Sequence, residues 1–312
     1  MEIKFISERR MIVLHVIASF VVIIVFFAGI FGNLMVCVIF FRSRLFYTHK
    51  NSLHISLAVA DCISCCFNSS LCLASIVIGP KSSLNSALCQ TQVTIYTIVY
   101  TINLVTLATI CILRTLILLY SRKRVPKKLT YTFIIISWLM GILLSILSNT
   151  LFEDDFYEMC ASVDIKTGKL NFGRLIGVPI VIICFVIILS CYFIVLRKRF
   201  KENVLRIYPV LGDAIKYQIT SSVKDPVVLH SNMTSIHTTL ILGLILFISY
   251  LPLTLLTFIP PERMEDRHSW FLFAFSISLV MSMLNPYVYS LRCAAFQKEV
   301  AKLTKFTFCC KK

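Results

Sequence analysis

Trp270-Phe-Leu-Phe-Ala-Phe-Ser-Ile-Ser-Leu-Val-Met-Ser-Met-Leu-Asn-Pro-Tyr-Val-Tyr-Ser-Leu291 is a stretch without a single charged side chain. As an α-helix it is long enough to cross the roughly 30 Å hydrocarbon core of a bilayer. Six further stretches are similarly long and apolar, and together the seven predict an all-α membrane protein with a seven-helix bundle. The predicted spans are approximately 11–41, 53–78, 87–120, 131–152, 175–196, 236–259 and 270–291.

The composition of the whole chain agrees with a membrane location. Of the 312 residues 58% are apolar and 15% are charged, whereas a soluble domain typically carries about 25% charged residues. A transmembrane barrel would show alternation with a period of two residues, and these stretches do not. The first stretch is much longer than the apolar part of a signal peptide, so it is interpreted as a retained helix.

The positive charges predict the orientation of the bundle. The net charge is +16, but the charges lie in short segments between apolar spans, so we expect no nucleic-acid partner and assign the excess to membrane lipids. If the amino terminus is outside, 22 of the 31 Lys and Arg residues lie on the inner side. We therefore predict one domain over 1–312, multi-pass in the plasma membrane, with 1–10 extracellular and 292–312 cytoplasmic.

Most of the thirteen cysteines lie inside spans, where Cys acts as a small apolar residue. Cys89 and Cys160 are different, because both fall on the predicted outer side, which is oxidising. A disulfide bond between them and a pair of unbonded thiols both remain open at this point.

Asp61 is the one acidic residue inside a predicted span, half way along the second, in Ser56-Leu-Ala-Val-Ala-Asp61. A carboxylate at that depth costs roughly 2.5 to 3.5 kcal/mol unless it finds partners. Asn or Ser side chains at a comparable depth could form a static hydrogen-bonded cluster or hold a small hard cation, and we favour the ion-responsive interpretation. These side chains are Asn33, Asn103, Ser282 and Asn285.

Arg114 ends the third span, 25 residues or about 37 Å of helix after Cys89. Its position alone favours a cation that reaches the inner interface. Prolines stand within the fifth, sixth and seventh spans, where each removes a backbone hydrogen bond and promotes a kink. They are Pro179, Pro252 and Pro286.

The residues after Tyr289 have apolar side chains at helical spacing beside basic ones. This pattern predicts an amphipathic eighth helix on the cytoplasmic surface. Cys309 and Cys310 follow it and are candidates for lipidation.

In their order and spacing these residues resemble the rhodopsin-like (class A) G-protein-coupled receptors over nearly the whole chain. No single motif carries the resemblance. The matching residues, from the first span to the seventh, are Gly32-Asn33, Leu57-Ala-Val-Ala-Asp61, Cys89 with Arg114, Trp138, Pro179, Tyr250-Leu-Pro252 and Asn285-Pro-Tyr-Val-Tyr289.

The resemblance implies roles for several of these residues. Cys89 and Cys160 would form the outer disulfide, and Arg114 would meet a heterotrimeric G protein when the sixth helix moves outward. Asn285, Pro286 and Tyr289 would belong to the same switch. The implied sodium pocket, which is the only cofactor-like site we expect, consists of Asp61, Asn103, Ser282 and Asn285.

The chain also departs from the family pattern at specific positions. Leu113 replaces the acid before the arginine and Thr115 the aromatic residue after it. We expect the missing acid to weaken the inactive-state restraint on Arg114 and to raise basal activity. Other departures are Ser249-Tyr250 in place of Cys-Trp, Leu246 in place of Phe and Ile187 in place of Tyr.

The outer half of the bundle would hold the ligand. Its aromatic lining suits a small apolar or weakly polar molecule, although core packing also explains these side chains, and a lipid or peptide ligand stays open. By resemblance, the lack of an acid at Tyr96 disfavours an amine, and the lack of a Lys between His268 and Leu291 excludes retinal. The candidate pocket residues are Asn68, Tyr96, Tyr100, Phe247, Tyr250 and Arg174, the last as a partner for an anion.

Three other classes of protein were weighed. The chain has no catalytic motif and no pair of intramembrane acids, so we do not expect an enzyme. A transporter or channel would favour internal repeats or rings of charge, which the seven dissimilar spans lack. A decoy or scavenging receptor of the same fold is a closer alternative, because Leu113-Arg114-Thr115 is altered.

Overall fold

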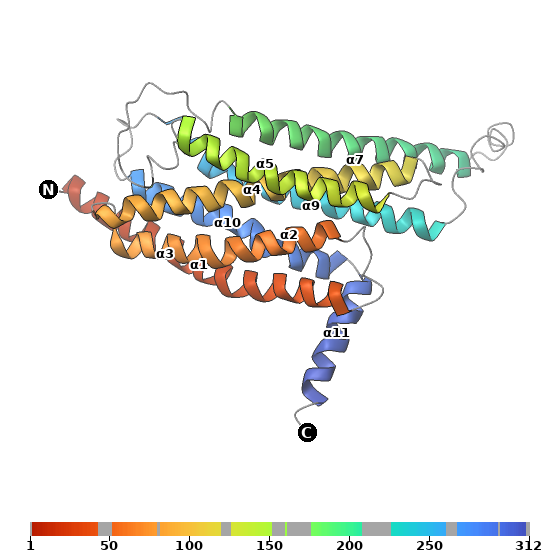
Figure 1. The fold of residues 1–312 in the computed structure, drawn as a ribbon, viewed down its shortest axis with the longest axis horizontal. Helices are drawn as coiled ribbons and strands as arrows, with labels where there is room; N and C mark the ends of the chain where they lie inside the picture. Colours follow the sequence, from red (N-terminus) through yellow and green to blue (C-terminus); the bar gives the residue numbers. More distant parts are fainter. Residues whose placement is uncertain are drawn as a thin grey trace.

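A computed structural model describes residues 2–42, 52–79, 82–119, 126–151, 160, 176–207, 226–259, 267–292 and 294–309. Long helices lie side by side in one bundle, and a shorter helix leaves it at a steep angle (Figure 1). The elements are α1 (Glu2–Arg42), α2 (Ser52–Ile63), η2 (Ser64–Asn68), α3 (Ser69–Ile78), α4 (Ser83–Leu119), α5 (Lys127–Leu151), α7 (Val178–Ile207), α9 (Pro226–Thr257), α10 (Arg267–Arg292) and α11 (Ala294–Cys309).

The prediction of seven spans is confirmed. Seven helical segments in the described part of the chain are long and apolar enough to cross a membrane, with α2, η2 and α3 forming one of them. The predicted ends differ by a few residues, and α1 begins already at Glu2, within the segment 1–10 predicted to lie outside the bilayer. The predicted amphipathic helix after the seventh span is α11.

The helices differ in how much of their surface other helices cover. In the most apolar stretch of α4, 67% of the residues are buried, whereas in that of α1 only 22% are. Phe20, Phe27 and Phe31 of α1 point away from the protein and are about two-thirds exposed. Lipid tails can solvate these side chains, so α4 is the central helix of the bundle and α1 lies at its edge.

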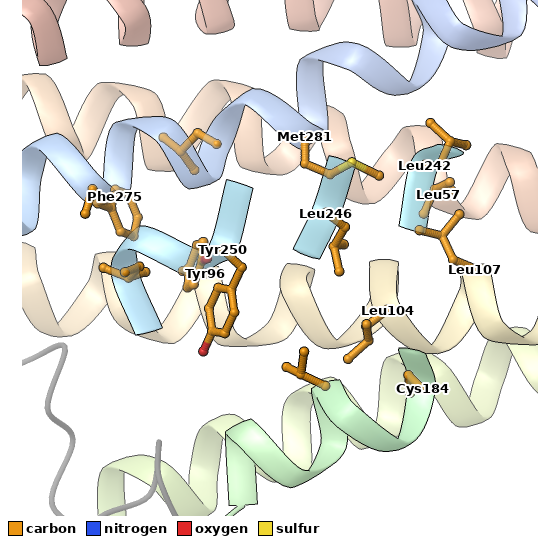
Figure 2. Close-up of a cluster of buried hydrophobic side chains, with 14 of the residues drawn as sticks. Leu57, Tyr96, Leu104, Leu107, Cys184, Leu242, Leu246, Tyr250, Phe275 and Met281 are labelled. Atoms are coloured by element: carbon orange, nitrogen blue, oxygen red, sulfur yellow. The ribbon is translucent and has the colours of Figure 1, made fainter. Parts of the chain in front are cut away.

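The core lies between α4 and the helices around it. Side chains from α2, α4, α7, α9 and α10 converge there (Figure 2). Its members include Leu57, Leu104, Leu107, Cys184, Leu242, Leu246, Phe275 and Met281.

Two local features differ from the sequence predictions. Pro179 is the second residue of α7 rather than a mid-helix residue, and a proline in the first turn interrupts no hydrogen bond, so the predicted kink at Pro179 is wrong. Pro252 and Pro286 do lie inside α9 and α10. The π-helical turn η2, which begins three residues after Asp61, was not predicted.

Replacing Gly141 of α5 by Ala should destabilise the bundle by about 1–3 kcal/mol. A Cβ atom there would lie 2.8 Å from the backbone carbonyl oxygen of Ile98 in α4, which cannot move without shifting that helix. Gly243 of α9 is the matched control, since its Cβ would meet only the side-chain end of Ile188 at 3.3 Å. Thermal unfolding of purified protein should show a lower Tm for Gly141→Ala and an unchanged or higher Tm for Gly243→Ala. Equal effects would contradict this packing.

Candidate functional site

Asp61 is completely buried at the centre of the bundle, between α2, α4 and α10. The side-chain amide of Asn103 donates a hydrogen bond to one carboxylate oxygen at 2.7 Å, and the amide of Asn285 donates to the other. The Ser282 hydroxyl also bonds to the carboxylate. We call Asp61, Asn103, Ser282 and Asn285 the Asp61 cluster; the four residues predicted to lie together do so.

Asn33 of α1 was expected in the same cluster, but it has a different partner. Its amide donates to the backbone carbonyls of Gly29, at 2.9 Å, and Ser282, at 2.8 Å. Gly32 allows this close approach, because a Cβ there would lie 2.6 Å from Cγ of Pro286. Asn33 therefore joins α1 to the backbone of α10 beside the Asp61 cluster.

Two oxygen atoms of the Asp61 cluster remain available to a cation. Oδ1 of Asn103 and Oδ1 of Asn285 are buried and have no hydrogen-bond partner among the residues described above. A cavity with about 20 Å³ open to the centre of a water molecule adjoins Asn103 and Ser282. That volume holds about one water molecule, and carboxylate, amide and hydroxyl oxygens are the donors that hard cations prefer. The residues therefore fit a sodium ion.

Aromatic rings line the other side of this cavity. Tyr96 and Tyr100 of α4 stack with ring centroids 5.7 Å apart, and Tyr100 stacks on Tyr250 of α9 at 4.4 Å. Phe275 of α10 lies 4.9 Å from Tyr96. Figure 2 shows Tyr96 and Tyr250 side by side above Leu104 and Leu246. Three of the predicted pocket residues, Tyr96, Tyr100 and Tyr250, thus form one aromatic stack that links α4, α9 and α10.

The other predicted pocket residues lie elsewhere. The amide of Asn68 donates to the Ser64 hydroxyl at 3.3 Å within the η2 turn. Phe247 stacks on Phe185 of α7, with ring centroids 4.9 Å apart, instead of joining the tyrosines. Arg174 lies outside the described residues.

Cys89 and Cys160 are joined by a disulfide bond, with their Cα atoms 5.6 Å apart. The carbonyl oxygen of Cys160 is a second anchor, which the sequence did not reveal. It accepts a hydrogen bond from the amide of Asn85 at 3.1 Å and lies 2.6 Å from Nδ1 of His268. We call the end of the bundle that carries this bond the disulfide end, and the opposite end, at Arg42 and α11, the tail end.

Residues 32–289 match the model of the 7 transmembrane receptor (rhodopsin family). The chain belongs to this receptor family. The crystal structure of squid rhodopsin resembles this receptor with a TM-score of 0.71 and 15% sequence identity, over 96% of the receptor and 88% of the squid chain, which shows that the two share a fold. No curated protein sequence gives a significant match. The family consists of receptors, so the expectation that the chain is not an enzyme is confirmed.

At the tail end of the receptor, Arg114 is half-buried and lies near His54 of α2. Leu113, which replaces the family's acid, is 6% exposed and packs with Leu53, Ile110 and the partly buried Phe133 and Ile134. The backbone carbonyl of Leu118 accepts a hydrogen bond from Nζ of Lys198 in α7. The end of α4 is therefore tied to α2 and α5 by apolar packing and to α7 by a lysine.

The last predicted residues lie at or beyond the receptor's tail end. Phe296 of α11 is buried against Phe40 of α1, with ring centroids 6.4 Å apart, so α11 is anchored to the bundle by its first turn. Tyr289 lies in α10 and Cys309 ends α11, but their side chains fall outside the described part of the structure, as does the whole of Cys310.

Proposed function

We propose that this receptor binds an extracellular ligand in the half of the bundle that holds the aromatic stack and activates a heterotrimeric G protein at the tail end. The Asp61 cluster is the restraint between the two. It joins three helices through one buried carboxylate, so a change in the position of α10 or α4 changes the hydrogen bonds of Asp61. This shared carboxylate is the observation that carries the proposal.

The orientation supports this assignment of ends. The disulfide between Cys89 and Cys160 favours an oxidising compartment on that side of the membrane. Basic residues gather at the other end, where cytoplasmic segments carry an excess of Lys and Arg. The described ones include Arg42, Arg114, Arg197, Lys198 and Arg292. The amino terminus is therefore extracellular and the plasma membrane is the proposed location.

The aromatic stack favours a small apolar or weakly polar ligand. Tyr96 and Tyr250 are nearly fully buried, and the cavity between them is too small for such a ligand until the rings separate. A ligand that inserts here must move Tyr250, which stands two residues before Pro252 in α9. Because a helix bends most easily at a proline, displacement of Tyr250 would tilt the tail-end half of α9 outward.

We further propose that a sodium ion binds the Asp61 cluster and stabilises the resting arrangement. When bound, the ion would supply the positive charge that the buried carboxylate lacks. Asp61, Ser282 and the unpaired amide oxygens of Asn103 and Asn285 would hold it, and they come from α2, α4 and α10. An ion held by three helices favours the arrangement in which the three are close together.

Sodium should therefore raise the Tm of the purified receptor relative to the same concentration of potassium. A ligand that binds only the folded state stabilises it by about RT ln(1 + [L]/Kd). Asp61→Asn should abolish the difference between the two salts, because the amide cannot supply the negative charge, while Asn68→Ala should preserve it. Equal Tm values in the two salts, or a sodium effect that survives in Asp61→Asn, would contradict the sodium site.

Arg114→Ala should abolish G-protein activation by the receptor. The arginine is the half-buried cation at the tail end of the central helix α4, where a G protein would dock. Nucleotide exchange on a panel of purified G proteins, measured with reconstituted receptor, gives the readout. Arg197→Ala is the control, because Arg197 lies over the ring of Phe193 on α7, 4.7 Å from its centroid. If wild type and Arg114→Ala are equally silent, the receptor is a decoy or scavenger.

Leu113→Asp should lower the basal activity of the receptor several-fold. A carboxylate at this position would pair with the neighbouring guanidinium of Arg114 and restore the restraint that the family pattern contains. Leu113→Asn is the matched control, since it has the shape and polarity of Asp without the charge. Basal nucleotide exchange should fall in Leu113→Asp relative to Leu113→Asn, at equal surface expression. Equal basal rates in the two variants would show that the missing acid does not set the basal activity.

A further inference from the structure

Two imidazole rings meet at the disulfide end, away from both the Asp61 cluster and the aromatic stack. His15 of α1 and His268 of α10 have ring centroids 6.5 Å apart and ring planes at 84°. His15 is half-buried and His268 is 4% exposed. The sequence analysis assigned neither residue a function.

The hydrogen bond of His268 fixes which of its nitrogens can bind a ligand. Nδ1 lies 2.6 Å from the carbonyl oxygen of Cys160, and a carbonyl oxygen can only accept, so Nδ1 carries the proton of the neutral ring. Nε2 then bears the lone pair, and this buried atom has no hydrogen-bond partner within the described ranges. Histidines that ligate metals have the same arrangement, since their second ring nitrogen usually donates to a carbonyl or a carboxylate.

The separation of the two rings also fits a shared metal ion. Zinc binds imidazole nitrogen at about 2.0–2.1 Å, which places the centroids of two rings on one ion about 5–6 Å apart. A small side-chain rotation covers the difference from 6.5 Å. The amide of Asn85 bonds to the same Cys160 carbonyl at 3.1 Å, and its buried Oδ1 finds no protein partner in the described segments, so it offers a neighbouring oxygen donor.

We propose that His15 and His268 bind a divalent transition-metal ion, best matched by Zn²⁺, that joins α1 to α10 at the disulfide end. Imidazole nitrogen favours zinc over calcium or magnesium, which prefer oxygen ligands. No group of three or more His, Cys, Asp or Glu residues suited to a metal occurs in the described parts of the chain, so water or an amide completes the coordination. Such a site binds reversibly and regulates, because two protein ligands are fewer than structural zinc sites use.

The site would act on the helix that also carries the Asp61 cluster. Its supply of zinc from outside the cell rests on the orientation given under the proposed function. The α1–α10 interface that it would clamp continues toward the tail end through the bond from Asn33 to Ser282 and the contact of Gly32 with Pro286. Zinc at His15 and His268 therefore restrains α10 relative to α1 from the extracellular side.

The test is the Tm of purified, full-length receptor in lipid nanodiscs during titration with ZnCl₂. Wild type should show a saturable rise that MgCl₂ does not produce. His268→Asn should weaken the apparent zinc affinity roughly tenfold or more, since loss of a ligand costs at least what loss of a second-shell partner does. Its amide can still donate to the Cys160 carbonyl, so the fold is kept. His15→Asn should have a similar effect, and His237→Asn, near the tail end of α9, should have none.

Three results would overturn the proposal. Wild type would show no zinc-dependent rise, or MgCl₂ would produce the same rise, or His15→Asn and His268→Asn would respond like wild type, which would assign zinc to the thiols elsewhere in the chain. The readout needs no signalling. Arg114→Ala receptor should bind zinc as wild type does, so failure of this proposal and failure of the proposed G-protein coupling are distinguishable.

Discussion

A single carboxylate buried in a membrane-spanning helix is the constraint on which the rest of this receptor depends. At that depth no water is available to solvate Asp61, so every compensating donor must come from the protein. The donors come from α4 and α10, one amide from each, with a hydroxyl of α10 beside them. A carboxylate that must be satisfied by two other helices ties the positions of all three together, and it does so half way between the two ends of the bundle.

The surrounding packing brings these helices close enough for that purpose. Gly32 leaves room for Pro286, and Asn33 uses that closeness to reach the backbone of Ser282, so α1 holds the same stretch of α10 from the other side. On the disulfide side of the cluster the lining changes from amides to stacked tyrosine rings that include Tyr250 of α9. A polar restraint and an aromatic stack thus share one small cavity, which is a plausible physical route by which a ligand at one could alter the other.

The sequence predicted the features that depend on hydrocarbon thickness and on the cost of buried charge. Both arguments are local, so they located the seven spans and identified Asp61 with its partners Asn103 and Asn285. The disulfide followed only from the family resemblance. Features that depend on the rotation of one helix against another were missed. Asn33 bonds to the α10 backbone instead of the carboxylate, and Phe247 turns toward Phe185, because the π-helical turn and the crossing of the helices set these directions. The contact of His268 with Cys160 joins residues far apart in the chain and has no local signal.

The most direct measurement of the central claim is a double-mutant cycle between Asp61 and Asn285, read out as the free energy of unfolding in mixed micelles. Asp61→Leu, Asn285→Leu and the double variant form the cycle, and Asn68→Leu replaces Asn285→Leu in a control cycle. A hydrogen bond to a charged group contributes about 1.5–3 kcal/mol, so the double variant should lose less stability than the two single variants combined, by about that amount, while the control cycle should be additive. Additivity in both cycles would contradict the account, since Asp61 would then not be the point at which α2 and α10 are joined.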